Sequence, residues 1–301
     1  MEVLILVMMT TLGAIFGSFA CCQAWRWRYY ARGKKSPGKW SACLHCKKRI
    51  AWYDNIPVVS WLVLGGKCRY CRKKIGIADF VSEIGMAVAF LMLSWAYLIP
   101  IMDNYTVWSQ QLLIVEIAAF VMTLLLMVVL TILAVYDAKW GELPTVLLIV
   151  SIVMGAIVCG LKIAATGLDL RHSAASSSLN SLVFMLEQNG VSGDVYVIAQ
   201  IVSTFLGVVI LAGTCFAIYK ISHEKMMGGG DWLLALALAL ALADWWLALW
   251  TIFLANLLGD VIALPGAIQK GKSKVYFGPF LVSAFVVVLI LGNCLPLLIN
   301  P

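Results

Sequence analysis

Long apolar runs, separated by short polar stretches, dominate the chain from one end to the other. The runs cover residues 4–24, 80–101, 112–136, 145–165, 196–219, 232–243, 246–268 and 276–298. Most of them contain about 20 residues or more, the length that an α-helix needs to cross the hydrocarbon core of a bilayer. The pattern therefore predicts an all-α polytopic membrane protein with about eight transmembrane helices.

The run at 232–243 is too short for a full crossing, so residues 232–268 form either two spans or one long span. With two spans, 20 of the 22 Lys and Arg residues fall on the same side as the polar segment 26–79, and Lys139 and Lys270 are among them. Cytoplasmic loops collect Lys and Arg. The charges thus favour eight spans, with the N-terminus outside and the polar segment in the cytosol.

Composition excludes a soluble globular protein, because 62% of the residues are hydrophobic and only 12% are charged. The stretch from Arg26 to Lys74 holds 14 of the 22 Lys and Arg residues. Beside apolar spans, such a block is typical of a cytosolic segment on anionic lipid headgroups, and we expect no nucleic acid partner. We therefore divide the chain into a first transmembrane helix (1–25), a cytosolic domain (26–79) and a seven-helix membrane domain (80–301).

Four cysteines in the cytosolic domain form two CxxC pairs, Cys43 with Cys46 and Cys68 with Cys71, with 21 residues between the pairs. Two such turns can bring four thiolates to one tetrahedral ion. The cytosol keeps thiols reduced, which favours a metal over disulfides. Four thiolates leave no open ligand position, so we predict a structural zinc ion that holds a small domain together. Two redox or merely structural cysteine pairs are the alternative.

Two acidic residues lie at the cytosolic ends of predicted spans. Asp137 closes the third span and Asp231 opens the sixth, so the topology puts both at one depth although 94 residues separate them. Two carboxyl groups held close together share a proton, and such a pair can activate water and protonate a leaving amine. The alternative is that each aspartate caps a helix or pairs with Lys139 or Lys225.

Three glycines, Gly228, Gly229 and Gly230, directly precede Asp231. Glycine allows close backbone approach and positive φ. An extended peptide substrate can therefore lie against this loop, and a flexible connection between two spans is the alternative interpretation.

Further short motifs occur in a fixed order along the chain. They are Gly17-Ser18-Phe19, the WYDNIP run from Trp52 to Pro57 with Ser60-Trp61-Leu62, Glu83, Asp137 with Leu143-Pro144, the GGGD run that ends at Asp231, and Phe277 to Leu281. In identity and order these motifs resemble the type IV prepilin peptidase family over nearly the whole chain. The WYDNIP run and the ordered pair of aspartates are the most specific of them.

This resemblance implies a GxGD-type membrane aspartyl protease of the bacterial inner membrane. Such enzymes remove the short basic leader from type IV prepilins or type II secretion pseudopilins at the cytosolic face. The resemblance makes Asp137 and Asp231 the proteolytic pair. It leaves the oligomeric state open. Because the leader is basic, we expect Glu142, Glu224 and the ionised aspartate to contact it.

The resemblance also implies that the cytosolic domain serves methylation of the new N-terminal residue, with S-adenosylmethionine as methyl donor. Asp54, Asn55 and Glu83 are the candidate residues for this step. The sequence departs from the family pattern at Cys21, where an Asn is usual, and at Leu233, where a Lys is frequent. A third departure lies at residues 78–80, where the family has Arg-Tyr-Pro.

Two other interpretations remain open at this stage. One is another GxGD intramembrane protease, of the presenilin or signal-peptide-peptidase type, although the CxxC domain and the WYDNIP run are not features of those proteins. The other is a non-enzymatic membrane scaffold or transporter with a zinc-stabilised cytosolic knob. Replacement of either aspartate by asparagine separates this second alternative from a protease.

Overall fold

The computed structural model describes residues 2–31, 33, 40–103, 108–168, 194–222, 227–270 and 276–299. In these residues the regular elements are helices, and two isolated β-bridges are the only pairing of extended segments. The elements are α1 (Glu2–Ala31), η1 (Trp52–Asn55), α2 (Val59–Val63), α3 (Ile77–Leu93), η2 (Ser94–Leu98), α4 (Ile99–Asp103), α5 (Gln110–Trp140), α6 (Thr145–Leu168), α9 (Asp194–Val208), η3 (Val209–Gly213), α10 (Thr214–Ser222), α11 (Asp231–Leu242), α12 (Trp245–Lys270) and α13 (Gly278–Ile299). The all-α prediction is therefore confirmed.

Five continuous helical segments are long and apolar enough to cross a membrane: Glu2–Tyr30, Ile77–Met102, Gln110–Trp140, Thr145–Leu168 and Val195–Ser222. Three shorter apolar helices follow, at Asp231–Leu242, Trp245–Val261 and Gly278–Gly292. The described residues thus contain five candidate membrane spans, and the count of eight stays a prediction.

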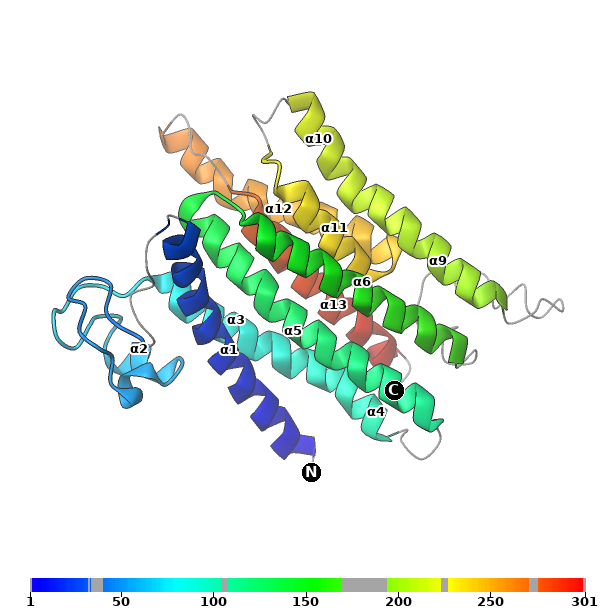
Figure 1. The fold of residues 1–301 in the computed structure, drawn as a ribbon, viewed down its shortest axis with the longest axis horizontal. Helices are drawn as coiled ribbons and strands as arrows, with labels where there is room; N and C mark the ends of the chain where they lie inside the picture. The colour runs from blue at the N-terminus through cyan, green and yellow to red at the C-terminus, as the bar shows by residue number, and fades with distance from the viewer. Residues whose placement is uncertain are drawn as a thin grey trace.

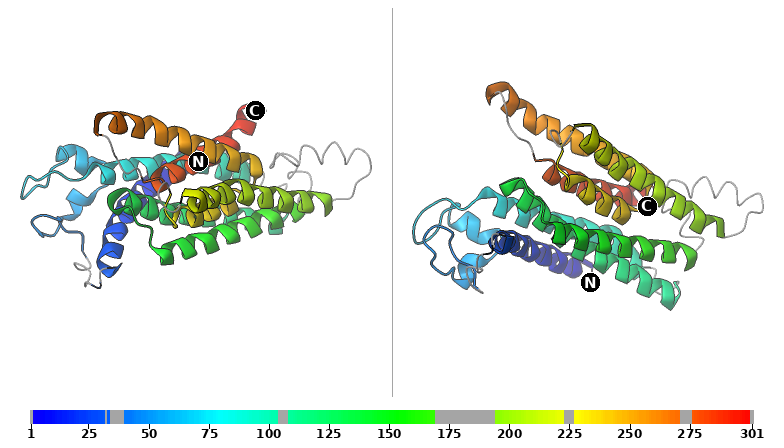
Figure 2. Two further views of the ribbon diagram at one scale, coloured as in Figure 1. Left: turned by 90° about the horizontal axis from the view of Figure 1, so that it is seen from above. Right: turned by 45° about the horizontal axis from the view of Figure 1, so that its top comes forward.

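The long helices run side by side, and the small polar segment sits at one end of them (Figure 1). At this polar end α1, α5 and α10 finish, while α3, α6 and α11 begin (Figure 1). Helix α1 packs against α3 and α5, α5 packs against α6, and α6 packs against α11. The further views in Figure 2 keep the same order of neighbours. Helix ends that are far apart in the chain therefore meet at the polar end.

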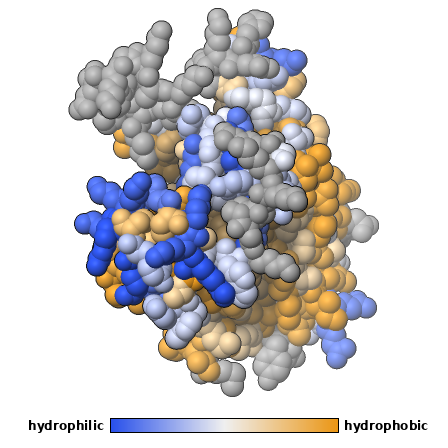
Figure 3. Space-filling view, turned by 60° about the vertical axis from the view of Figure 1, so that its left-hand side comes forward, coloured by the Kyte–Doolittle hydropathy of each residue, from blue (hydrophilic) through white to orange (hydrophobic). Residues whose placement is uncertain are grey.

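Large hydrophobic residues are exposed along the described helices, and Figure 3 shows this orange apolar surface beside the blue polar end on one face of the molecule. The interior is also apolar and centres on α5 and α11, where Leu130, Leu133, Leu234 and Leu238 are fully buried. Helix α11 alternates leucine with alanine, and small side chains let neighbouring helices approach closely in a membrane. The bilayer and not water is the solvent that suits this surface.

Helix α11 is too short to cross a bilayer. Its 12 residues rise about 18 Å, and it ends in a left-handed residue, Ala243, with φ 53°. The Nζ of Lys162 donates hydrogen bonds to the carbonyl oxygens of Ala241 and Leu242, at 3.0 and 3.1 Å. Nε2 of Gln200 donates to the carbonyl oxygen of Ala243 at 2.6 Å. These polar side chains satisfy the backbone that a helix break leaves open at membrane depth.

The helices reach into the polar segment that the sequence pattern outlines. Helix α1 continues to Ala31 and α3 begins at Ile77, so the compact part of the segment spans residues 40–76. Residues 169–193, 223–226 and 271–275 lie outside the described part, so Glu224, one of the acids expected to contact the leader, is among the residues not described.

Candidate active site and metal centre

Asp137 lies one turn before the end of α5. The helix stops at Gly141, which has φ +65° and whose N–H donates to the carbonyl oxygen of Asp137 at 2.7 Å. A Cβ at Gly141 would also overlap the ring of Tyr276, so both conformation and space require glycine there. The side chain of Asp137 accepts a hydrogen bond at Oδ2 from the N–H of Gly278, at 3.1 Å. The end of α5 and the start of α13 thus meet at this carboxyl group.

Asp231 is the first residue of α11, and Gly230 is the N-cap. Oδ2 of Asp231 accepts a hydrogen bond from the N–H of Gly228 at 3.0 Å, so the carboxyl group folds back onto its own glycine loop. A Cβ at Gly230 would lie 2.9 Å from Cβ of Leu143. Gly230 therefore lets the loop pack closely on Leu143, and the approach of a peptide substrate to the loop stays a prediction.

The positive φ that glycine allows is not used in this run. Among the described glycines, positive φ occurs at Gly33, Gly65, Gly66 and Gly141, and at none of the three that precede Asp231. Gly228 donates its N–H to the carboxyl group of Asp231. Gly230 has no side chain and therefore leaves room for Leu143.

One cavity of about 330 Å³ opens between these elements. Its lining is Asp137, Gly141, Glu142, Leu143, Gly228, Gly229, Gly230, Asp231, Tyr276 and Phe277. Asp137 and Asp231 are both buried, with 5% and 7% of their surface exposed. The two predicted acids, the glycine loop and the Leu143 motif therefore surround a single hollow near the polar end of the bundle.

Lys139, the nearest basic residue to Asp137 in the sequence, points elsewhere. Its Nζ lies 3.7 Å from Oδ1 of Asp79 and 5.2 Å from the ring centre of Trp25. It thus joins α5 to α1 and α3 and does not pair with Asp137. Lys225 lies outside the described residues.

Glu142 lines the cavity but already has a basic partner. Nη1 of Arg28, near the end of α1, forms an ion pair with Oε2 of Glu142 and donates to the hydroxyl of Tyr136 at 3.3 Å. The Arg28 guanidinium also lies over the ring of Trp140, at 5.5 Å. Sequence reasoning missed Arg28 and Tyr276, because no motif marks a contact between helices this distant in the chain.

The four cysteines of the CxxC pairs converge. Their Sγ atoms all lie within 4.8 Å of one another, and those of Cys43 and Cys71 are 3.8 Å apart. A tetrahedral zinc ion with Zn–S bonds of about 2.3 Å requires S–S separations of about 3.8 Å. Burial acts to raise the pKa of the Cys43 thiol, but hydrogen bonds from the backbone of Cys46 and His45 and from the side chains of Cys68 and Cys46 together lower this pKa to about 7. The cluster therefore fits a metal ion that binds thiolates.

The two CxxC turns have the same backbone design. Lys47 and Arg72 each follow the second cysteine with φ 60° and 57°. The N–H of Cys43 donates to Lys48 and that of Cys68 to Lys73, at 3.0 and 2.9 Å. Each turn thus presents its pair of sulfurs in the same way, which makes convergence on one ion geometrically simple.

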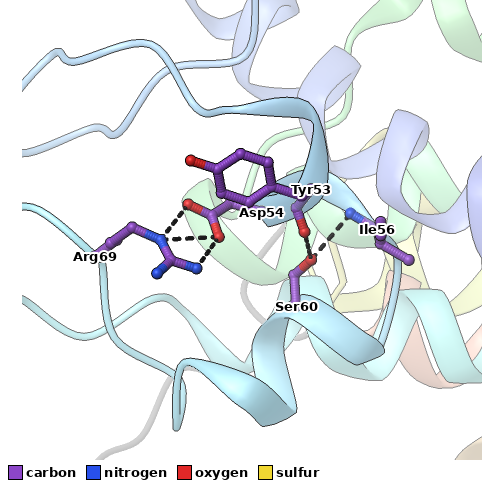
Figure 4. A network of polar contacts seen from close by, with 5 residues as sticks. All are labelled: Tyr53, Asp54, Ile56, Ser60 and Arg69. Atoms are coloured by element: carbon purple, nitrogen blue, oxygen red, sulfur yellow. Dashed lines mark hydrogen bonds and ion pairs between the residues drawn. The ribbon is translucent and has the colours of Figure 1, made fainter.

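Asp54 of the WYDNIP run is held by an arginine. Nε and Nη2 of Arg69 donate to both carboxylate oxygens at 2.6 to 3.1 Å, as Figure 4 shows. This contact lowers the pKa of Asp54. In the same view, Ser60 donates to the carbonyl oxygen of Tyr53 and accepts from the N–H of Ile56. Asp54 thus braces a compact loop.

Glu83 supports the other end of this loop. Its Oε2 accepts a hydrogen bond at 2.7 Å from the N–H of Val58, a β-branched residue with φ 63°. Ser18 also hydrogen-bonds Glu83, and a Cβ at Gly17 would lie 2.5 Å from the carbonyl oxygen of Ser82. The Gly17-Ser18 motif therefore packs tightly on α3 beside Glu83.

Of the three candidate residues for methyl transfer, Asp54 and Glu83 both serve the shape of the same loop, whereas Asn55 is exposed. The structure also shows the surroundings of two residues that depart from the family pattern, Cys21 and Leu233. Sγ of Cys21 lies 3.0 Å from Oγ of Ser82, in the contact between α1 and α3. Leu233 packs against the hydrophobic core.

Comparisons with known proteins agree with these motifs. Residues 11–97 match the family model of the bacterial peptidase A24 N-terminal domain. A prepilin leader peptidase/N-methyltransferase of Pseudomonas aeruginosa is 26% identical over 84% of this chain and 72% of its own length. The enzyme of the same name from Vibrio cholerae is 40% identical over 18% of this chain. A type 4 prepilin-like proteins leader peptide-processing enzyme of Escherichia coli is 32% identical over 34% of this chain.

The match to the Vibrio cholerae relative spans 22% of that protein, and the match to the Escherichia coli relative spans 46% of that one. No solved structure matches the chain. The family model and the long alignments nevertheless confirm the resemblance carried by the motifs. The chain is thus similar to bacterial prepilin leader peptidase/N-methyltransferases over most of its length, and its residues 11–97 match the A24 N-terminal domain model.

Proposed function

We propose that this protein is a membrane endopeptidase that removes the leader peptide from type IV prepilins or pseudopilins. One observation carries the proposal. Asp137 and Asp231, buried and 94 residues apart in the chain, line one cavity together with the glycine loop at residues 228–230. The names of the relatives supply the substrate class.

In the proposed reaction one carboxyl group of the pair is ionised and the other is protonated. The carboxylate takes a proton from water, whose oxygen attacks the scissile carbonyl carbon, while the other aspartate protonates the carbonyl oxygen. Collapse of the tetrahedral intermediate breaks the C–N bond, and the amine leaves with a proton from the pair. The N–H of Gly278 donates to Oδ2 of Asp137, and the N–H of Gly228 donates to Oδ2 of Asp231. These hydrogen bonds support a fixed orientation of both carboxyl groups during proton transfer.

We propose that the substrate lies extended along the glycine loop. A strand that passes Gly228 and Gly229 would lie against residues that have no side chains of their own, while Leu143 and Phe277 form apolar walls of the same cavity. Such a strip suits the junction between a basic leader and a hydrophobic helix. The Arg28–Glu142 ion pair borders this junction, and a basic leader residue that replaces Arg28 on Glu142 would be a specific contact.

We also propose the topology with eight spans, with the zinc-binding segment and both aspartates in or beside the cytosol. Helix α12 has 26 residues and α13 has 22, lengths that suffice for a crossing. Short α11 would enter from the cytosolic side and end at the polar break that Lys162 and Gln200 stabilise. The gathering of helix ends and basic residues at one end supports this orientation. The membrane would be a bacterial inner membrane.

For the metal centre we propose zinc, held by Cys43, Cys46, Cys68 and Cys71 in a closed structural site.

For the cytosolic segment we propose methylation of the new N-terminal amine, with S-adenosylmethionine as co-substrate. The relatives' names support this second activity. Because Asp54 and Glu83 are engaged in holding their loop, Asn55 is the candidate with a side chain free for a substrate contact.

The proteolytic proposal is tested by co-expression with a type IV prepilin and mass spectrometry of the pilin. We expect leader loss with the wild type and none with Asp137→Asn or Asp231→Asn. Asp260→Asn is the matched control, because Asp260 is an exposed acid of α12 that does not line the cavity. An added methyl mass on the product would establish the second activity in the same spectrum.

Cleavage that persists in both variants would overturn the assignment of the pair. If the wild type inserts correctly but neither it nor any variant processes any tested pilin, the scaffold or transporter interpretation would be favoured. Cleavage of a substrate within its membrane helix would favour the presenilin-like alternative.

A further inference from the structure

Helix α2 of the small polar segment is fixed to the start of a membrane helix. The ring of Trp61 stacks on that of Phe80, in the first turn of α3, with 4.4 Å between ring centres. The N–H of Val58, which precedes α2, donates to Glu83 in the second turn of α3. Because α3 starts a candidate span at Ile77, these contacts hold α2 within about 10 Å of the beginning of that span along its axis.

The outer side of α2 is aliphatic and uncovered. Val59, Leu62 and Val63, which we call the α2 edge, are 53%, 58% and 74% exposed. Isolated exposed apolar residues are common on soluble surfaces, but three on a helix of five residues, at a fixed place beside a span, form a patch. Figure 3 shows hydrophobic surface among the hydrophilic residues at this end of the molecule.

The α2 edge is the neighbour of a lipid-facing stripe. Ile77, Val81, Ile84 and Val88 are all exposed and recur at helical spacing along α3. Phe80, on which Trp61 stacks, lies next to this stripe on the helical wheel. The stack of Trp61 on Phe80 therefore places α2 beside an exposed apolar face of α3.

Basic residues lie in the segment that connects α2 to α3. Lys67, Arg72, Lys73 and Lys74 follow α2 directly and are all exposed. With the proposed cytosolic placement of this segment, lysine and arginine beside the start of a span would meet the anionic headgroups of the cytoplasmic leaflet. An aliphatic edge with a basic border is the pattern of an element that lies in the membrane interface.

We infer that the α2 edge is a membrane anchor of the small segment, which inserts Leu62 and Val63 into the cytosolic leaflet while the adjoining lysines bind anionic headgroups. This anchor would hold the metal-binding segment at a fixed height above the cavity. The inference is independent of the proposed chemistry, since it rests on the placement of α2 beside a span and not on Asp137 or Asp231.

The test uses the full chain with p-benzoylphenylalanine, a photocrosslinking residue, at one position at a time. The positions are Val63, Val81 as the lipid-facing reference, and Leu44, a residue of the first CxxC turn that is 42% exposed, as the control. Each protein is reconstituted in vesicles of phosphatidylcholine with or without phosphatidylglycerol, irradiated, and analysed by mass spectrometry for lipid adducts.

We expect a lipid adduct at Val63 several-fold above that at Leu44 and close to that at Val81. Lys73→Glu with Lys74→Glu should lower the Val63 adduct in vesicles that contain phosphatidylglycerol and leave it unchanged in phosphatidylcholine alone. An adduct at Val63 no higher than at Leu44 would overturn the anchor. Transfer of the crosslink from lipid to a co-reconstituted prepilin would also overturn it and would make the α2 edge a substrate-docking surface. No effect of the charge reversal in either membrane would overturn the role of the lysines.

Discussion

The carboxyl group of Asp137 is held from across the bundle by the backbone of Gly278, whose N–H lies 3.1 Å from Oδ2. The two residues are 141 positions apart in the chain. A Cβ at Gly278 would lie 2.6 Å from the same oxygen, so the contact exists only because residue 278 is glycine. The first turn of α13 thus positions a candidate catalytic group that belongs to α5.

From this contact we predict that Gly278→Ala lowers kcat for leader cleavage by about 100-fold, because displacing a reacting group by about 1 Å has that effect. KM should change much less, since the substrate strip along residues 228–230 is untouched. Initial rates with purified protein and a prepilin peptide measure both constants.

The matched control is Gly160→Ala, since a Cβ at Gly160 in α6 meets nothing within 4 Å. Equal kcat losses in the two variants would show that the Gly278 contact has no special part in the reaction.

We predict that Lys162→Met destabilises the protein by about 1–3 kcal/mol, the usual effect of leaving buried polar groups unpaired. The variant strands the carbonyl oxygens of Ala241 and Leu242 at membrane depth. Unfolding of the protein in detergent, followed by circular dichroism, measures the change. Lys220→Met, at an exposed lysine near the end of α10, should leave stability within about 0.5 kcal/mol of the wild type. A stable Lys162→Met protein would mean that other groups or water satisfy the break.

Much of this architecture follows from sequence because its signals are local. A 20-residue apolar run needs no partner to be recognised, and alternation of topology then puts Asp137 and Asp231 at one depth. The spacing of the CxxC pairs similarly predicts convergence of four sulfurs, which the structure contains.

Contacts between distant helices could not be predicted in this way. The pairing of Arg28 with Glu142 depends on how α1 packs against α5, and no periodicity encodes that register. The expected contact of Glu142 with the basic leader stays a prediction, and nothing in the sequence indicates that Arg28 already pairs with this carboxylate. The contact of Lys162 with the end of α11 could not be predicted from the sequence either. A lysine near the end of an apolar run is most simply assigned to a loop.

Acid should loosen the loop that Asp54 braces. Arg69 lowers the pKa of Asp54 in the folded protein. The ion pair therefore contributes its full stability above the ordinary aspartate pKa of about 3.9 and loses it as the pH falls through the lower folded value. Hydrogen exchange of residues 52–60 at decreasing pH should show protection that falls in the wild type at low pH. In Asp54→Asn the protection should already be low at neutral pH and lack this step. A wild-type profile identical to that of the variant would contradict a stabilising role for the pair.

Removal of one thiolate should release the metal and open the small segment. We predict about one zinc ion per wild-type chain by elemental analysis and little or none in Cys68→Ser, because a site with three thiolates and a serine loses affinity and its closed geometry. Limited proteolysis should then cut residues 40–76 rapidly in the variant while the helical bundle survives, since the bundle's core does not include the cluster. Cys22→Ser is the control, because Cys22 lies in α1 outside the cluster and should keep both zinc and protease resistance. Full zinc content in Cys68→Ser would show that the four sulfurs do not act as one site, whereas zinc loss without new cleavage would show that the metal is dispensable for the fold of this segment.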